Sequence, residues 1–486
     1  MMRWARILQA VLVLLVVGGL GGWLVLFRPV AQPASRDLAA IFNHGSIGNE
    51  ETQGIPYWIW RVLPQVFPDL LPDGGDGYAA FGVHWQQGEE LPVGFSKMTL
   101  GVVPRVAPNC AFCHQGSYRL TPEMPAQLVS AGPGTRVNVQ AYLRFLSRAG
   151  QDARFTSARV MQEIDAIADL PLWERALYRY ALIPATRKAL GELASDFQWT
   201  GTRPDWGPGR IDPFNPVKFG ALGLSDDGTI GNSDMMPLWA LGPIASDGDG
   251  IRSMHWDGLM TDLHETVIAG AIGDGMTWQS FARTRANLAR MEEFARLQSP
   301  PPSPFRSDLA PGAPYHVDPA QVAAGRAIYA RICADCHDPG GARFRQPIPA
   351  AELGTDRHRL DMWTIAARDR YTAYQHDYSW GFRSFRKTGG YTAVNLTGLW
   401  LRGPYLHNGS VPTLRDLLMP PRARPKTFLR GSDLIDPRNG GFRPDPTSPG
   451  WRYDTTLPGN DNGGHLWGTD LPPTDREALL SYLKTM

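Results

Sequence analysis

The chain has 486 residues, which is too many for one compact core and predicts two or three domains of roughly 100–200 residues each. Its hydrophobic fraction of 43% is ordinary for a folded protein, so long disordered regions are not expected. The 48 Lys and Arg residues almost balance the 47 Asp and Glu residues, which excludes the basic surface of a nucleic-acid-binding protein.

The N-terminus carries an apolar run that is long enough to cross a membrane. Arg3 and Arg6 precede the run from Ile7 to Phe27, in which Gln9 is the only polar residue. A helix of about 20 apolar residues rises roughly 30 Å, the thickness of the hydrocarbon core of a bilayer. We therefore expect residues 1–30 to form a transmembrane signal anchor, with a cleaved secretory signal as the alternative. In either case the arginines stay in the cytoplasm and the remainder is exported, which in a bacterium means the periplasm.

All four cysteines lie in Cys-x-x-Cys pairs, and a histidine follows each pair directly. The two motifs are Cys110, Cys113 and His114, and Cys333, Cys336 and His337. This is the attachment sequence of a c-type haem, with two thiols for the vinyl groups and a histidine for the iron. Disulfides would not need the histidines, and the two pairs of a zinc site usually lie about 15–20 residues apart. The motifs therefore predict two covalently bound haem c groups.

Helical patterns alternate with loop-rich segments in the first part of the chain. Residues 45–101 are dense in Gly, Pro and Trp, which is typical of loops and short segments. From Val137, "VNVQAYLRFLSRAG" spaces apolar residues three and four positions apart, as in a helix. The stretch Leu172–Phe197 is also amphipathic, and we expect Pro184 to break its helix because proline lacks an amide hydrogen. Residues 277–298 predict a long helix.

Three successive prolines follow this long helix, in "SPPPSPF". They cannot continue a helix and form a semi-rigid spacer. The domain boundary is therefore expected at about residue 300–315. The N-terminal haem domain is assigned to residues 36–305 and the C-terminal cytochrome c domain to residues 315–486.

The second domain opens with a helix that leads into the second attachment motif. Asp318 is placed to cap it, with Pro319 at its first position. At the end of the chain, Thr474 and Glu477 predict a capping box, and the leucines within Leu479–Leu483 supply an apolar stripe. A helix that enters Cys-x-x-Cys-His and a closing helix that crosses it resemble a class I cytochrome c domain. The expected fold is mostly α, with two class I cytochrome c-like haem domains, loop-rich extensions and an N-terminal transmembrane or signal helix.

Two further segments resemble the bacterial di-haem cytochrome c peroxidase superfamily, which includes di-haem maturation enzymes and rubber oxygenases. "HWDGLMTDLHETVIAGAIGDG", from His255 to Gly275, resembles the Trp-Asp-Gly segment of that superfamily. "GLWLRGPYLHNGSVPTLRDLL", from Gly398 to Leu418, resembles the Pro-Tyr-(Phe/Leu)-His-(Asp/Asn)-Gly segment of its second haem domain. The resemblance implies two haems in separate domains, with Trp256 on the electron path between them.

The sequence departs from the peroxidases above the first haem. Those enzymes carry a Gln and then a Glu there, and the carboxylate moves protons while the O–O bond breaks. Here Thr266 and Met276 fall at these positions, and neither side chain moves a proton at neutral pH. We place Glu265 and Ala271 in the distal pocket. The small residues Gly270 and Ala271 predict an open iron face that suits neutral diatomic ligands better than charged intermediates.

The axial ligands of the irons are predicted from position. His114 and His337 are expected to be the proximal ligands, since each directly follows its cysteines. For the sixth ligand of the second iron we predict His465, which a glycine-rich loop presents just before the last helix. The resemblance to rubber oxygenases, whose second haem is bis-histidine, implies the same. The alternatives are His358, Met362, His376, His407 and Met419, although His407 is better explained as a loop-pinning residue.

These observations predict an oxidoreductase that takes electrons from a small soluble or membrane-bound donor at the C-terminal haem. The N-terminal haem would pass them to peroxide or dioxygen. One alternative is a pure electron carrier with two six-coordinate haems, and another is a rubber-oxygenase-like dioxygenase that acts on an apolar substrate. Family members often hold Ca²⁺ between their domains. The acidic turns Asp226–Gly228 and Ser246–Gly250 offer oxygen atoms, although ordinary turns are the preferred interpretation.

Overall fold

The computed structural model describes residues 37–241, 253–374, 385–448 and 450–486, together with Val13, residues 16–19 and Gly21. Within these ranges no helix combines the length and the apolar character that crossing a bilayer requires. The predicted anchor, residues 1–30, lies for the most part outside the described residues.

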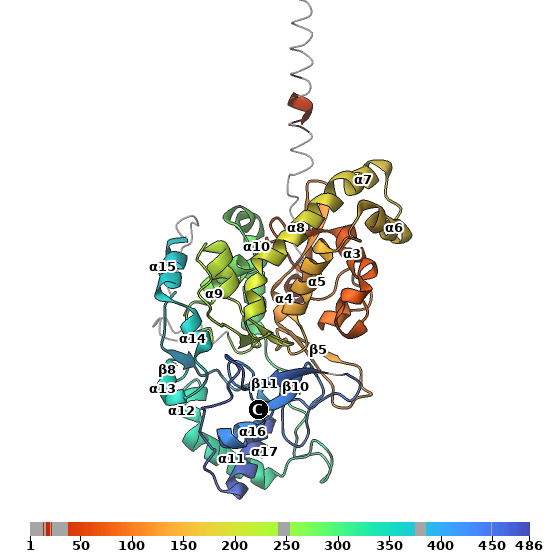
Figure 1. The fold of residues 1–486 in the computed structure, drawn as a ribbon. Helices are drawn as coiled ribbons and strands as arrows, with labels where there is room; N and C mark the ends of the chain where they lie inside the picture. Colours follow the sequence, from red (N-terminus) through yellow and green to blue (C-terminus); the bar gives the residue numbers. More distant parts are fainter. Residues whose placement is uncertain are drawn as a thin grey trace, which may run out of the picture.

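The first part of the chain is built from short helices and small antiparallel sheets. Its elements are α2 (Leu38–His44), β1 (Ile55–Pro56), α3 (Tyr57–Val66), β2 (Phe95–Leu100), β3 (Val103–Pro108), α4 (Cys110–Cys113), β4 (Gln115–Tyr118), β5 (Gln127–Ser130), α5 (Val139–Gln151), α6 (Ser157–Ile167), α7 (Leu172–Leu177), α8 (Ile183–Asp196), β6 (Arg210–Ile211), β7 (Ser233–Asp234), α9 (Leu263–Gly273) and α10 (Trp278–Leu297). Strands β1, β3 and β2 form one sheet in that order, and β4–β5 and β6–β7 form pairs. Helices α3, α5, α6, α7 and α8 gather at one end of the molecule (Figure 1).

Much of the second part lies at the opposite end of the molecule (Figure 1). Its elements are α11 (Pro319–Ile332), α12 (Ala334–His337), β8 (Pro347–Pro349), α13 (Ala350–Leu353), α14 (His358–Met362), α15 (Ile365–Tyr374), β9 (Gly390–Thr392), α16 (Leu414–Leu417), β10 (Thr427–Arg430), β11 (Trp451–Asp454) and α17 (Pro473–Thr485). Helices α11, α12, α16 and α17 lie together at this end, and the β10–β11 pair lies between them and the first part (Figure 1). Helix α15 lies beside α9 of the first part (Figure 1).

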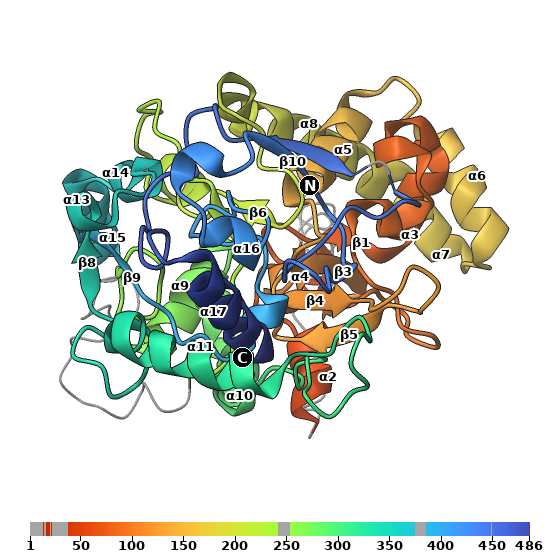
Figure 2. The ribbon, with the colours of Figure 1, turned by 90° about the horizontal axis from the view of Figure 1, so that it is seen from below.

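The helix that leads into the second Cys-x-x-Cys pair packs directly against the last helix of the chain. Asp318 caps α11 by accepting a hydrogen bond from the amide of Ala320, as expected. Figure 2 shows α17 lying alongside α11. Gly325 is at their contact, where a Cβ atom would collide with the carbonyl oxygen of Ala478. Glycine at this position lets the two backbones approach closely.

The predicted helix ends are partly right. Thr277 caps α10 through a capping box with Ser280, and the helix ends at Leu297, before the prolines. Pro184 does not break its helix, because a π-helical turn from Tyr178 to Leu182 precedes it and α7 continues into α8. A wider turn of this kind relieves the clash that proline makes in a regular α-helix.

The capping box predicted for the last helix is wrong. Helix α17 begins at Pro473, two residues earlier than expected, and no side chain caps it. Glu477 instead forms an ion pair with Arg415 of α16. The apolar stripe is confirmed, because Leu479, Leu480 and Leu483 are all buried.

Buried contacts join the two parts of the chain. Arg119 donates to Asp433 at 2.8 Å and also pairs with Asp445, and Ser117 donates to the other oxygen of Asp433 at 2.8 Å. One apolar cluster contains residues from before and after the proline-rich linker, such as Ile272 and Trp363. The linker therefore separates two stretches of sequence that pack against each other.

Candidate haem centres

The first attachment motif is held at the junction of the β-sheet and α2. Cys110 and Cys113 are the ends of the single-turn helix α4, whose N-cap Asn109 accepts a hydrogen bond from the amide of Ala111. The Asn109 amide group donates to the carbonyl oxygens of Phe42 and Gly45 at 3.2 and 3.0 Å. Asn109 therefore caps the cysteine-bearing turn and fixes it to α2.

The histidines that follow the two cysteine pairs have the same hydrogen-bonding arrangement. Nδ1 of His114 lies 2.8 Å from the carbonyl oxygen of Met236, and Nδ1 of His337 lies 2.8 Å from that of Val394. Because a carbonyl oxygen only accepts, each Nδ1 carries the hydrogen and each Nε2 keeps a free lone pair. Burial lowers the pKa of both imidazoles, so both are neutral at pH 7. A metal-ligating histidine is oriented in this way.

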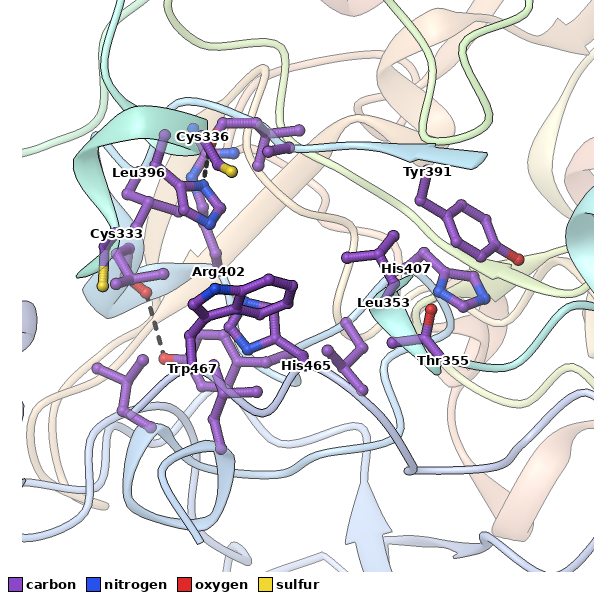
Figure 3. A pocket seen from close by; sticks show the side chains of 18 of the residues that line it. Cys333, Cys336, Leu353, Thr355, Tyr391, Leu396, Arg402, His407, His465 and Trp467 are labelled. Atoms are coloured by element: carbon purple, nitrogen blue, oxygen red, sulfur yellow. Dashed lines mark hydrogen bonds between the residues drawn. The ribbon is translucent and has the colours of Figure 1, made fainter. Parts of the chain in front are cut away.

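A cavity opens beside the second motif. Its wall is mostly apolar, with leucines from α16 and α17, and Cys333, Cys336 and His337 line it on one side. His465 and Trp467 also line it and project into the same space (Figure 3).

His337 and His465 face each other across this cavity. Their ring centroids are 6.3 Å apart. Two imidazoles that ligate one ion from opposite sides, each with a metal–nitrogen bond of about 2.0–2.1 Å, place their centroids roughly 6 Å apart. Burial, and then the charges of His337 and Arg424, lower the pKa of His465 to about 3, so its ring is neutral. The pair therefore fits the two axial positions of one iron.

The backbone around His465 is tightly constrained. The amide of His465 donates to the carbonyl oxygen of Leu353 at 2.8 Å, and Arg424 donates to the carbonyl oxygens of Gly464 and His465 at 2.9 and 3.3 Å. Gly464 has a φ of +70°, and a Cβ atom there would collide with the backbone of Gly354. The glycine-rich loop thus presents the imidazole from a fixed position.

The other ligand candidates lie in different environments. His358 pairs with Asp356, Met362 is buried in the apolar cluster shared with the first part, and the Met419 sulfur accepts from Arg476. His376 lies outside the described residues. His407 lines the cavity but stacks on Tyr391, with ring centroids 3.9 Å apart. Among the described candidates, His465 alone has a ring contact with His337.

A short segment around β7 touches both centres. Trp256 lies in the cavity wall, and its indole nitrogen donates to the carbonyl oxygen of Asp234 at 3.4 Å. The amide of Asp234 donates to the carbonyl oxygen of His407 at 2.8 Å. Two residues on, Met236 accepts from His114 and also lines the second cavity. Residues 234–236 therefore connect the first proximal histidine to the wall of the second cavity.

Helix α9 carries the residues predicted for the distal pocket of the first centre. Ala271 is fully buried in the apolar cluster against which Cys110 packs, and Met276 is buried in the same cluster. A Cβ atom at Gly270 would meet nothing within 4 Å. Glu265 is buried in the first turn, and the Thr266 hydroxyl donates to the carbonyl oxygen of Asp262. Ala271 is therefore packed inside the protein, whereas Gly270 faces open space.

Asp274, at the C-terminal end of α9, is a site residue that the sequence did not reveal. It is exposed to solvent, and partial desolvation by the protein around it raises the pKa of its carboxyl group above the usual range. It lies close enough for its charge, after burial itself, to raise the pKa values of the Cys110 and Cys113 thiols. A carboxyl group with a raised pKa is thus present beside the first attachment motif.

Replacing Asp274 with asparagine is expected to stabilise the protein in a pH-dependent way. A carboxyl group whose pKa is raised in the folded state destabilises the fold once pH exceeds its unfolded value of about 3.9, and the full cost applies above about 7. We expect the melting temperature to rise on the order of 1–3 °C at pH 8 and not at pH 4. Thermal unfolding at both pH values measures this, and an equal effect at both would contradict it.

The acidic turn Asp226–Gly228 is explained by ion pairs. Asp226 pairs with Arg203, and Asp227 lies 2.6 Å from the Lys218 ammonium nitrogen. The other acidic turn considered for calcium, Ser246–Gly250, lies outside the described residues.

The residues present fit a covalently bound haem at the second centre. Cys333 and Cys336 would hold the vinyl edge of the macrocycle, and His337 and His465 its iron, while the apolar wall would cover the ring. At the first centre Cys110, Cys113 and His114 have the equivalent arrangement.

A sequence segment in the wall of the second cavity matches a known family. Residues 390–429 match the RoxA-like, cytochrome c-like family. The matched segment contains Tyr391, Val394, Arg402 and His407 of the cavity wall. The chain thus contains a cytochrome c-like region of the RoxA-like kind, and such a region implies covalently bound haem c.

Two proteins of Sinorhizobium fredii are similar to parts of the chain. The uncharacterized protein y4iM is 35% identical over 164 residues, which are 28% of this chain and 37% of that protein. The uncharacterized protein y4iJ is 43% identical over 105 residues, which are 20% of this chain and 18% of that protein. The chain therefore spans well under half the length of these relatives.

Proposed function

We propose that this chain is a di-haem c-type cytochrome with oxidoreductase activity. It takes electrons from an external donor at the second centre and delivers them to peroxide or dioxygen at the first. The observation that carries the proposal is the repeated arrangement of His114 and His337, each behind a Cys-x-x-Cys pair and each with Nδ1 bonded to a backbone carbonyl oxygen at 2.8 Å. The match to RoxA-like, cytochrome c-like proteins supports it.

The two centres have different roles in this proposal. A haem supplies a one-electron redox centre and an axial position for a small ligand. His337 and His465 face each other across the second cavity, which supports electron relay there. At the first centre His255 is close enough to interact electrostatically with His114, but its ring packs on Phe214, with centroids 5.9 Å apart, so the proposal leaves the axial position opposite His114 open.

Two side chains of this chain serve the proposed reaction directly. Trp256 lies in the wall of the second cavity and is bonded to the segment that also holds His114, so its indole is placed to carry electrons between centres. Asp274 lies beside the first motif, and the fold raises the pKa of its carboxyl group. It offers the proton transfer that Thr266 and Met276 cannot provide.

A second candidate is an oxygenase that acts on an apolar substrate. The match of residues 390–429 to the RoxA-like family favours it. A pure electron carrier with two six-coordinate haems is the third interpretation. The three functions differ in whether the first centre binds an external ligand and in which oxidant it uses.

Spectroscopy of the intact protein separates these functions. We expect a haemochrome assay to give two haems per chain, EPR of the oxidised protein to show one high-spin and one low-spin haem, and carbon monoxide to bind one reduced haem. Two low-spin haems without carbon monoxide binding would overturn both enzymatic functions. If carbon monoxide binds, peroxide-dependent oxidation of a reduced cytochrome supports a peroxidase, whereas dioxygen consumption with an apolar polymer supports an oxygenase.

Replacing Trp256 with phenylalanine is expected to slow turnover while leaving both haems attached. Phenylalanine keeps an aromatic ring in the cavity wall but removes the hydrogen bond to Asp234 and is much harder to oxidise. Steady-state turnover and haem stoichiometry are measured together, with Trp467 to phenylalanine as a matched change in the same cavity. Unchanged turnover in the Trp256 variant would remove this residue from the electron path.

We further propose that the chain is anchored in the inner membrane and faces the periplasm. The apolar run from Ile7 to Phe27, with Arg3 and Arg6 before it, supports this location. Cell fractionation with carbonate extraction tests it, and release of the protein into the soluble periplasmic fraction would indicate a cleaved signal instead.

A further inference from the structure

The second cavity has a polar end opposite its cysteines. Cys333 and Cys336 lie on one side of the cavity, and Thr355, Tyr391 and His407 lie on the other (Figure 3). The wall between them is mostly apolar. A ligand that fills this cavity therefore meets thiols at one edge and polar side chains at the other.

Several polar atoms in the wall of this cavity are buried without a partner. The Thr355 hydroxyl, the Thr392 hydroxyl and Nε2 of His407 have no hydrogen-bond partner among the described residues, and all three side chains line the cavity. A buried polar group without a hydrogen-bond partner destabilises the fold. Three such groups in the wall of one cavity point to a ligand with hydrogen-bonding atoms, and two of them, Thr355 and His407, lie opposite the cysteines (Figure 3).

A buried positive charge lies behind His407. Arg210 is fully buried, and none of its three guanidinium nitrogens has a hydrogen-bond partner among the described residues. Its guanidinium carbon lies 4.9 Å from the centre of the Tyr453 ring. Burial lowers the pKa of His407 to about 3, and the charges of Arg359 and then Arg210 lower it as well, so both arginines lie near this histidine.

The nearest carboxylate is already engaged. Asp234 pairs with Arg210 along the β6–β7 ladder, but its side chain accepts from Arg430 at 2.5 Å. Asp356, the other acidic neighbour, pairs with His358. Two buried arginines thus share one buried aspartate. A buried guanidinium without a hydrogen-bond partner is strongly destabilising, so a negatively charged group that binds Arg210 would stabilise this region.

A covalently attached haem supplies such a charge at this place. Its vinyl groups and its propionates lie on opposite edges of the macrocycle, so bonding the vinyl edge to Cys333 and Cys336 directs the propionates to the other end of the cavity. Hydroxyl, imidazole and guanidinium groups are the side chains that bind carboxylates in proteins.

We propose that Thr355, Thr392 and His407 bind the propionates of the second haem and that Arg210 balances their charge. The proposal rests on the proposed function, because its ligand is the second haem. Asp234 belongs to the same charge group and stays paired with Arg430. In this arrangement Arg210 is a positioning residue that sets the electrostatic potential at the second iron.

Potentiometry of the full-length holoprotein tests the role of Arg210. Oxidised haem carries one more positive charge than reduced haem, so removal of a buried cation near it favours the oxidised form. Arg210→Met is expected to lower the midpoint potential of the second haem, and the charge-conserving Arg210→Lys is expected to lower it less. The potential of the first haem, distinguished by its carbon monoxide binding, serves as the internal reference. A second-haem potential that is unchanged in Arg210→Met would overturn the proposal.

Two near-isosteric variants keep the test decisive if Arg210→Met does not fold. His407→Phe preserves the stacking on Tyr391 but removes both ring nitrogens, and Thr355→Val removes only a hydroxyl group. Each should lower the potential of the second haem and alter the resonance Raman bands of its propionates, and unaltered bands in both variants would overturn the proposal. The number of haems per chain distinguishes a failure of the proposed function from a failure of the propionate site. Fewer than two haems in the wild-type chain contradicts the proposed function, whereas two haems with unchanged potentials contradicts only the propionate site.

Discussion

Replacing His465 with alanine is expected to convert the second haem from a six-coordinate, low-spin centre into one that binds carbon monoxide. The imidazole lies 6.3 Å from that of His337, centroid to centroid, and no other described candidate ligand has a ring contact with His337. Its backbone is held by Leu353 and Arg424, so the loop should keep its shape when the ring is removed. We expect EPR to lose its low-spin signal and carbon monoxide binding to rise from one haem to two per chain.

Two variants control this experiment. His465→Met retains a sixth ligand, so it should stay low-spin and raise the midpoint potential, because a thioether favours the reduced iron relative to imidazole. His358→Ala removes a histidine that pairs with Asp356 and should leave both spectra unchanged. A His465→Ala protein that stays low-spin and excludes carbon monoxide would show that another side chain, such as Met419, ligates the second iron.

The sequence predicts those features of the fold that depend on neighbouring residues. Asp318 and Thr277 cap their helices as expected, because the cap and the amide that it binds are two or three residues apart. The cap predicted at Thr474 failed, since Glu477 found a stronger partner in Arg415, 62 residues away in the sequence. Pro184 was accommodated by a π-helical turn that the apolar pattern does not encode.

In the candidate haem centres, too, the sequence predicts what neighbouring residues determine and misses what distant residues determine. Each attachment motif lies within five residues, so its cysteines and histidine can be identified from the sequence alone. The acceptors that orient the histidines are backbone carbonyl oxygens, 122 residues from His114 and 57 residues from His337. Any residue type can supply a carbonyl oxygen, so no sequence signal marks them. Asp274 was missed because its raised pKa comes from the surrounding fold and not from its neighbours in sequence.

Replacing Gly325 with leucine is expected to destabilise the second part of the chain severely. Gly325 lies where α11 meets α17, and an added Cβ atom would collide with the carbonyl oxygen of Ala478 and lie 2.8 Å from Cβ of Tyr482. A backbone carbonyl cannot swing aside as a side chain can, so the helices must separate. Overpacking typically costs about 1–3 kcal/mol, and we expect a loss at or above the upper end of this range.

Separation of α11 and α17 would also reach the second haem centre. Helix α11 leads directly into Cys333, and Leu479 and Leu483 of α17 line the cavity that His465 enters. Urea unfolding followed by the absorption of the haem is therefore expected to show an earlier transition for Gly325→Leu, with loss of the low-spin signal of the second haem. Gly340→Leu is the matched control, because an added Cβ atom there meets nothing within 4 Å. Equal stability of the two variants would show that the α11–α17 contact does not hold the second centre together.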